Sequence, residues 1–195
     1  MLPEVPGLAR AEIAARANAF VRAWAPVRAA RPGPFPLVRV FEDLPTQMPG
    51  VITGVDDLAS GVEGACYPDG RVFLSEDTYR RLIRDEGRAR FTTAHEIGHA
   101  CLHRHFIRRV LTEGIAPSFK RRDGMKPYLN PEWQANVFAS CVLMPAVAMK
   151  VFAAEYAANR IPTLTSFQEA VRDTFLVSYE AAGIRISEMT RAGHL

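Results

Sequence analysis

The sequence predicts an α+β protein: a small antiparallel β-sheet packed on a helical core, followed by a C-terminal helical tail. Short runs of β-branched and apolar residues, separated by turn residues, occupy residues 37 to 74 and indicate the strands. Apolar residues recur at helical spacing from residue 78 to 105 and again from 131 to 189, which indicates the helices. A hydrophobic share of 48% in 195 residues is enough to bury a substantial core.

The first 36 residues are expected to form a helix and a proline-rich linker. Apolar side chains recur at helical spacing between Gly7 and Trp24, and this pattern ends before Pro26. Several prolines between residues 26 and 36 exclude regular structure there, because proline lacks a backbone N–H and fixes its own φ angle. Residues 1–36 are therefore expected to form an N-terminal helix and linker.

Short strands are expected next. Leu37–Phe41 (LVRVF) is rich in β-branched and apolar residues, and Val51–Val55 and Gly64–Tyr67 have a similar composition. The turn residues Pro68-Asp69-Gly70 predict a hairpin whose return strand is Arg71–Leu74. These strands would form a small antiparallel sheet. A short helix over Thr78–Arg84, capped by Ser75 and broken by Gly87, would follow it.

A longer helix, from about Arg88 to His105, carries the sequence His95-Glu96-Ile97-Gly98-His99. Residues four apart lie on one helix face, so the two imidazoles can aim at one point, and such a pair suits a zinc ion. The intervening Glu96 projects about 100° round the helix from His95, where it can reach a water beside the metal. This H-E-x-x-H arrangement is typical of zinc peptidases. Glycine at position 98 costs about 1 kcal/mol relative to alanine and suggests close approach of another backbone or of substrate.

A catalytic zinc site needs a third protein ligand. His103 lies about 12 Å along the helix from the level of His95, so an unbroken helix cannot bring it to the same ion. A carboxylate on another helix is therefore expected. The best placed is Glu132, and the alternatives left open are Glu113, Asp123 and Glu155.

Asn130-Pro131 predicts the start of the next helix, because asparagine caps helices and proline is favoured at the first helical position. That helix should carry Glu132 in its first turn and Asn136 one turn later on the same face, where Asn136 can hydrogen-bond a ligand histidine. Residues 112 to 130, with the basic run Lys120-Arg121-Arg122, should form an exposed loop. The expected helices are Pro131–Met144, Val147–Asn159, Thr165–Phe175 and Ser178–Met189.

Composition excludes several other classes of protein. A formal charge of +3 and a pI near 8.9 are too mild to indicate a nucleic-acid partner. Three widely spaced cysteines, with no C-x-x-C pair, predict reduced thiols and neither a disulfide framework nor a cysteine-type zinc site. The N-terminus lacks the pattern of a signal peptide, and no apolar run is long enough for a membrane span. A cytoplasmic protein without membrane contact is expected.

Two sequence blocks, FTTAHEIGHACLH and EWQANVFASCVLMP, resemble the ImmA/IrrE family of metallo-endopeptidases, which are gluzincin-like proteins of bacteria, phages and mobile elements. The first block begins at Phe91 and the second at Glu132, and both follow the family pattern in the same order. The similarity extends over roughly residues 65 to 190. Cys141 and Val142 depart from the polar-leucine pair that is usual in the family.

The resemblance implies one zinc ion on His95, His99 and Glu132, with Glu96 as general base. It also implies that residues 37–160 form a zinc metallopeptidase domain, with residues 161–195 as a helical tail packed on it. The expected substrate is a regulatory protein, such as a helix-turn-helix transcriptional repressor. Some members of the family show proteolysis only with difficulty when they are alone.

The substrate contacts are predicted less directly. If Arg71–Leu74 lies at a sheet edge above the site, then Arg71, Val72 and Phe73 can hold a peptide as an added strand. Tyr128 is a further candidate for contact with the substrate, and the candidates for stabilising the oxyanion are Tyr128, Tyr67 and His105.

The alternative function is that of a zinc-containing regulatory protein that acts through protein or DNA contacts without proteolysis. Residues Thr165–Met189 form two expected helices joined at Leu176-Val177-Ser178, which is compatible with a helix-turn-helix. The second helix offers only Arg185 and Arg191 as basic contacts, so DNA is not the expected partner.

Overall fold

The computed structural model describes residues 5–67, 69–112, 126–159 and 164–195, without the side chains of 105–112 and 164–165. In these residues, helices dominate and accompany a three-stranded sheet, so the predicted α+β class is confirmed. The elements in chain order are α1 (Arg10–Trp24), η1 (Pro26–Ala29), α2 (Leu37–Gln47), β1 (Ile52–Val55), β2 (Gly64–Cys66), β3 (Arg71–Leu74), α3 (Glu76–Ile83), α4 (Gly87–Thr112), η2 (Pro127–Leu129), α5 (Pro131–Leu143), α6 (Ala146–Asn159), α7 (Leu164–Phe175) and α8 (Tyr179–Arg191).

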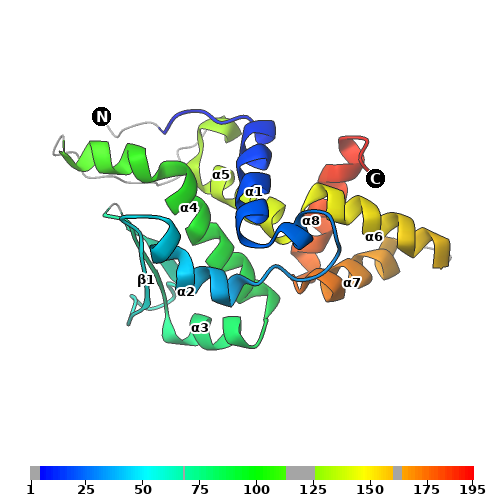
Figure 1. The fold of residues 1–195 in the computed structure, drawn as a ribbon, viewed down its shortest axis with the longest axis horizontal. Helices are drawn as coiled ribbons and strands as arrows, with labels where there is room; N and C mark the ends of the chain where they lie inside the picture. Colours follow the sequence, from blue (N-terminus) through cyan, green and yellow to red (C-terminus); the bar gives the residue numbers. More distant parts are fainter. Residues whose placement is uncertain (1–4, 68, 113–125, 160–163) are drawn as a thin grey trace.

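Helices α4 and α5 form the centre of the molecule. Figure 1 shows the sheet with α2 and α3 at one end, α6, α7 and α8 at the other, and α1 lying over α5. The predicted caps are present: the Ser75 hydroxyl accepts from the Thr78 N–H at 3.2 Å, and the Asn130 side chain accepts from the Glu132 N–H at 2.9 Å. Helix α4 continues to Thr112, beyond the predicted end, and the run Lys120-Arg121-Arg122 lies outside the described residues.

The sheet is mixed, so the prediction of a wholly antiparallel sheet is wrong. The predicted hairpin is confirmed, because β2 pairs antiparallel with β3, with Ala65 opposite Phe73. The strand order is β1-β3-β2, and β1 pairs with β3 in parallel, with Thr53 opposite Val72. The chain passes from β1 to the far side of the sheet before the hairpin returns β3 between the two. Consequently β3 is the central strand rather than an edge.

The prediction of a strand at Leu37–Phe41 is also wrong, because these residues begin helix α2. The five-residue window reads as a strand only in isolation. With Leu44 included, the apolar positions follow the i, i+3, i+4, i+7 spacing of a helix face. The side chains on that face are all buried, and they are Leu37, Val40, Phe41 and Leu44.

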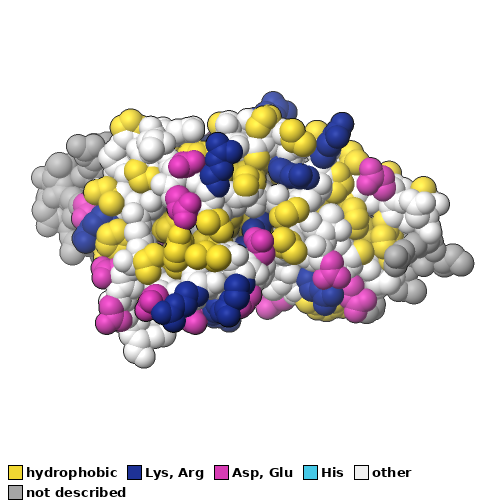
Figure 2. Space-filling view, turned by 60° about the horizontal axis from the view of Figure 1, so that its bottom comes forward, with side chains coloured by type: hydrophobic (Ala, Val, Ile, Leu, Met, Phe, Trp, Pro, Cys, Tyr) yellow, Lys and Arg dark blue, Asp and Glu magenta, His cyan; other side chains and the backbone are white. Residues whose placement is uncertain are grey.

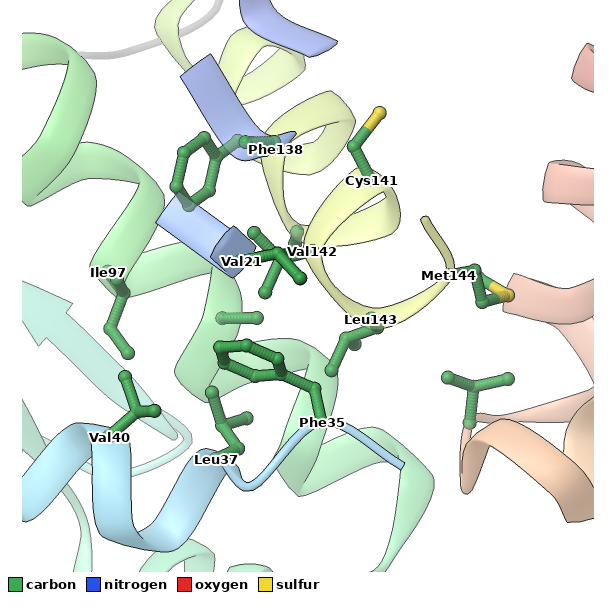
Figure 3. Packing of buried hydrophobic residues seen from close by; sticks show 14 of the residues in the cluster. Val21, Phe35, Leu37, Val40, Ile97, Phe138, Cys141, Val142, Leu143 and Met144 are labelled. Atoms are coloured by element: carbon green, nitrogen blue, oxygen red, sulfur yellow. The ribbon is translucent and has the colours of Figure 1, made fainter. Parts of the chain in front are cut away.

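One hydrophobic core joins these elements. In Figure 3, Val21 of α1, Leu37 of α2 and Ile97 of α4 converge with Phe138 of α5 and with Phe35, which precedes α2. All five side chains are at least 98% buried. The N-terminal helix is therefore part of the same core as the helices that carry the H-E-x-x-H motif.

A buried arginine connects the start of α4 to the segment before α2. The Arg90 side chain is 1% exposed, and its Nη2 donates to the carbonyl oxygen of Phe35 at 2.7 Å. Its Nη1 pairs with the Asp85 carboxylate at 2.6 Å. Burial lowers the Arg90 pKa, and the neighbouring Asp85 opposes that change. A buried guanidinium held in this way fixes the direction in which α4 enters the core.

Candidate metal centre

The close crossing of α4 and α5 forms the site. A Cβ atom at Gly98 would lie 3.3 Å from both the Cα and the carbonyl oxygen of Ala135, and 3.2 Å from the Phe138 ring. The absence of a side chain at Gly98 therefore lets the two helices approach closely, as the sequence suggested. This approach brings the first turn of α5, with Glu132, beside the two histidines of α4.

His95, His99 and Glu132 converge on one point. The Nε2 atoms of His95 and His99 are 3.0 Å apart, and they lie 3.2 and 3.3 Å from the two oxygens of the Glu132 carboxylate. A tetrahedral ion with ligand bonds of about 2.0–2.1 Å holds its ligand atoms roughly 3.3 Å apart. The spacing and the donor set of two imidazoles and a carboxylate therefore fit a zinc-sized ion.

The alternative third ligands do not join this group. Glu155 is exposed on α6 and is not part of the three-residue cluster. Glu113 and Asp123 lie outside the described residues. The Glu132 carboxylate forms hydrogen bonds with both histidines. Burial alone would raise the Glu132 pKa, but these hydrogen bonds hold it well below its usual range.

Glu96 lies beside the cluster. Its side chain is 9% exposed, it lines a depression together with His95, and the Cys66 backbone N–H hydrogen-bonds its carboxylate. Burial raises the Glu96 pKa, and the charges of His95 and His99 oppose the change. A Cβ atom at Gly64 would lie 3.0 Å from the Glu96 side chain, so strand β2 packs directly against it. The carboxylate is thus placed to accept a proton next to the three ligand atoms.

Asn136 contacts His95 as the sequence predicted. The Asn136 Oδ1 atom lies 2.8 Å from His95 Nδ1. An amide oxygen only accepts, so His95 carries its proton on Nδ1 and presents the Nε2 lone pair to the centre of the cluster. This is the tautomer that a metal ligand of this orientation requires.

A buried chain of hydrogen bonds supports His99, and sequence reasoning missed it. His99 Nδ1 lies 3.0 Å from His103 Nδ1, and His103 Nε2 lies 2.8 Å from Gln134 Oε1. The Gln134 amide donates to the carbonyl oxygens of Tyr128 at 2.7 Å and Pro6 at 3.1 Å. Because both carbonyls only accept, the amide must turn its oxygen towards His103.

The protons of this chain follow from that orientation. Gln134 Oε1 accepts from His103 Nε2–H, so His103 Nδ1 is an acceptor and takes the Nδ1–H of His99. His99 then presents its Nε2 lone pair to the cluster. Burial, together with the charge of His99, lowers the His103 pKa to about 3, which keeps the ring neutral. The i+4 spacing from His99 to His103 was the available sequence signal.

The predicted substrate contacts on β3 required this strand to lie at a sheet edge, and it does not. Val72 is fully buried, and the Arg71 side chain pairs with Asp69 at 2.8 Å and covers the Tyr67 ring at 4.7 Å. Phe73 packs edge-on against Tyr67. Since β3 has a strand on each side, the prediction that Arg71, Val72 and Phe73 add a peptide strand is wrong.

The other predicted contacts are not placed at the cluster. Tyr128 is 43% exposed in η2, where its ring lies against Gly7, and it is not among the residues lining the depression at His95. The side chain of His105 lies outside the described residues. The oxyanion-stabilising group therefore stays unassigned.

Of the two arginines that α8 offers as basic contacts, Arg185 is buried and Arg191 is exposed. Arg185 is 6% exposed, its Nε donates to the Met144 carbonyl oxygen at 3.1 Å, and it faces Glu188 at 3.7 Å. Arg185 therefore connects α8 to the end of α5. On the face of the molecule in Figure 2, basic and acidic side chains are interspersed and form no patch of one sign.

Within the described residues, no single helix has the length and apolar character to cross a membrane, although the bent pair α5 and α6 meets both requirements together.

A helix bearing H-E-x-x-H, crossed by a second helix that supplies a glutamate, defines a metallopeptidase-type domain. The sequence matches the family model of peptidase family M78, described as the IrrE N-terminal-like domain, over residues 83–187. The chain belongs to this family, which confirms the resemblance seen in the sequence. The assignment indicates a metallopeptidase-type protein.

No curated protein matches the sequence. Among solved structures, the chain is similar to a Mycobacterium tuberculosis transcriptional regulator, with 14% identity and a TM-score of 0.54. The match covers 88% of this chain and 45% of that one, so this chain spans less than half the length of its structural neighbour. At this identity the likeness concerns the fold alone.

Proposed function

We propose that the protein is a zinc-dependent endopeptidase with a regulatory role, which cleaves a specific protein such as a helix-turn-helix transcriptional repressor. The observation that carries the proposal is the spacing of the His95, His99 and Glu132 ligand atoms, 3.0 to 3.3 Å, with the Glu96 carboxylate beside them. Membership of a peptidase family supports the same reaction class. A ligand cluster without Glu96 would support metal binding only.

The chain's own residues divide the chemical work. A zinc ion held by His95, His99 and Glu132 would supply Lewis-acid polarisation of the scissile carbonyl and of a water molecule. Glu96 accepts the proton of the attacking water and delivers it to the leaving amine nitrogen. Asn136 and His103 keep the two imidazoles in the tautomers that point Nε2 inwards.

We propose that β2, rather than β3, receives the substrate chain. Among the described strands, β2 pairs with β3 only, so its other edge carries no strand. Gly64 of β2 lines the depression that contains His95 and Glu96. An extended peptide added to this edge would pass directly over Glu96.

We also propose that residues 37–160 form the catalytic unit, with residues 1–36 and 161–195 as supports packed on it. Hydrogen bonds that cross the boundaries of this unit support the packing of both flanking segments on it. Gln134 binds the Pro6 carbonyl, Arg90 binds the Phe35 carbonyl, and Arg185 binds the Met144 carbonyl.

The first test is metal binding. The natively purified protein should contain about one zinc ion per chain, and Glu132→Gln should lower zinc affinity by more than about 100-fold, because it removes an anionic ligand. Glu155→Gln, at an exposed glutamate of α6, is the matched control and should bind zinc like the wild type. Zinc-free wild-type protein that also fails to take up added zinc would overturn the proposal.

The second part of the test is proteolysis. Co-expression with a repressor encoded beside the gene should yield two repressor fragments with the wild type and intact repressor with Glu96→Gln. The Glu96→Gln protein should still bind zinc, because Glu96 is not one of the three ligands. Equal cleavage by both proteins would show that Glu96 is not the general base. Intact repressor with zinc-loaded wild type would favour a regulator that acts through contacts alone.

A further inference from the structure

A groove leads away from the metal centre towards α8. The depression at His95 and Glu96 has a volume of about 390 Å³, and a neighbouring groove between α4, α5 and α8 has about 590 Å³. The two share five lining residues, Glu63, Arg88, Phe91, Thr92 and Asn136. They therefore form one continuous trough that begins at the reacting groups, and its volume is in the range of natural ligand sites.

The floor of the groove is apolar, and part of it is uncovered. Phe91, Trp133 and Val137 line it from α4 and α5, and Ile184 lines it from α8. The Ile184 side chain is 52% exposed, although the neighbouring Arg185 and Ile186 are buried. An exposed isoleucine in a concave wall contributes little to folding, but it contributes apolar area when a ligand side chain covers it.

Two polar atoms beneath the groove form no hydrogen bond within the described part of the chain. They are the hydroxyl oxygen of Ser140, a residue that is 7% exposed, and one carboxylate oxygen of Glu188. The Glu188 carboxylate pairs with Arg10 at 2.8 Å and faces Arg185 at 3.7 Å. Both atoms are covered by their neighbours, so the apolar lining and the charge of the groove are the features that point to a ligand.

One carboxylate of the groove is unpaired in the described ranges of the chain. Three carboxylates line it, those of Glu63, Glu180 and Glu188. Glu63 pairs with Arg88 at 2.8 Å, and Glu188 pairs with Arg10 at 2.8 Å. Glu180 is exposed and forms no ion pair among the described residues. A basic side chain entering the groove would therefore meet uncompensated negative charge.

The far wall is fixed in place. A Cβ atom at Gly87 would lie 2.4 Å from the Val177 carbonyl carbon and 2.5 Å from the Ser178 nitrogen, so the start of α4 touches the turn before α8. The Arg185 hydrogen bond to Met144 holds the same helix to α5. Helix α8, which forms this wall, is therefore attached to both α4 and α5.

We propose that this groove binds the substrate polypeptide on one side of the scissile bond, and that it selects a bulky apolar side chain close to a basic one. The inference rests on the proposed peptidase function and adds the chemistry of its substrate. Phe91 and Ile184 are the residues that determine the apolar preference, and Glu180 contributes to the basic preference.

The test uses a synthetic, positionally degenerate dodecapeptide library. Zinc-loaded Glu96→Gln protein is immobilised and the retained peptides are sequenced, while zinc-loaded wild type is used to map the cleaved bonds. Ile184→Glu removes apolar contact and adds charge at an exposed position. Ile83→Glu, at an isoleucine of α3 that is 55% exposed and outside the groove, is the matched control.

The expected result is enrichment of peptides with neighbouring apolar and basic residues, reduced at least about tenfold by Ile184→Glu and unchanged by Ile83→Glu. Binding with this preference but no cleavage by the wild type would leave the groove established and overturn the peptidase function. Cleavage with the same preferences in Ile184→Glu would overturn the groove and leave the function intact. Failure of zinc-loaded Glu96→Gln to retain any peptide would also overturn the groove.

Discussion

The two histidines of the candidate metal centre have different surroundings. The His95 side chain is 15% exposed, lines the depression and is hydrogen-bonded to Asn136, which is itself exposed. The His99 side chain is 7% exposed, and behind it His103 and Gln134 are essentially fully buried. His95 therefore lies on the open side, at the depression, and His99 is anchored in the interior.

This difference indicates how the chain combines access with a fixed geometry. On the open side, one exposed amide sets the tautomer of His95. On the buried side, the tautomer of His99 depends on a chain of hydrogen bonds that ends at the Pro6 carbonyl, outside the matched region 83–187. Buried polar networks are costly when one member is lost. Substitutions on the buried side should therefore affect both metal binding and stability, whereas those on the open side should affect metal binding alone.

The largest effect is expected at Gly98, because the open and the buried side of the site both depend on the crossing of α4 and α5 there. Gly98→Val would force α5 away from α4, because even a single Cβ lies 3.3 Å from the Ala135 backbone. Zinc affinity should fall about 100-fold or more, and the free energy of unfolding should fall by about 1–3 kcal/mol. Chelator competition and urea unfolding measure the two quantities. Gly98→Ala should lie between the valine variant and the wild type. Wild-type zinc affinity in Gly98→Val would show that the crossing does not set the ligand spacing.

A smaller effect on zinc affinity, again together with a loss of stability, is expected on the buried side. His103→Phe leaves His99 Nδ1–H and Gln134 Oε1 without their partners. Zinc affinity should fall about 10- to 100-fold, and the metal-free protein should lose about 2–4 kcal/mol of stability. His194→Phe, at an exposed histidine, is the matched control. Unchanged stability together with unchanged zinc affinity would show that the buried hydrogen bonds of His103 do not support the site.

The smallest effect is expected on the open side. Asn136→Ala removes the acceptor for His95 Nδ1–H, but water can replace it because the position is exposed. Zinc affinity should fall about tenfold or less, and stability should stay within about 0.5 kcal/mol of the wild type. Asn159→Ala, at an exposed asparagine of α6, serves as the control. A loss of stability as large as that of His103→Phe would erase the distinction between the two sides.

The sequence predicted those features that depend on spacing along one element. The positions of His95 and His99 on α4, and the cap of α5 at Asn130, follow from local rules. The structure brings Glu132 to these histidines, as expected. Helix rise correctly separated His103 from the shared point, but the same rise places it beside the second nitrogen of His99. The i+4 spacing of His99 and His103 is therefore a sequence signal for this contact.

Other features depend on contacts between distant segments and were not accessible in this way. The Gln134 amide reaches His103 only because α5 crosses α4 at that depth. The window Leu37–Phe41 fits a strand and a helix equally until Leu44 is counted with it. The parallel pairing of β1 with β3 inserts a strand between two that are neighbours in sequence order, and no local turn signal encodes it.

The buried guanidinium of Arg90 shows that the region matched by the family model should not be excised or exchanged by itself. Arg90 lies inside the matched region, but the carbonyl that accepts its hydrogen bond belongs to Phe35, 48 residues before that region begins. A fragment cut at the boundary of sequence similarity would leave a positive charge in an apolar interior with half of its support missing. Exchange of the matched region between relatives should therefore retain the segment around Phe35. The region matched by the family model is shorter than the region that packs as one core.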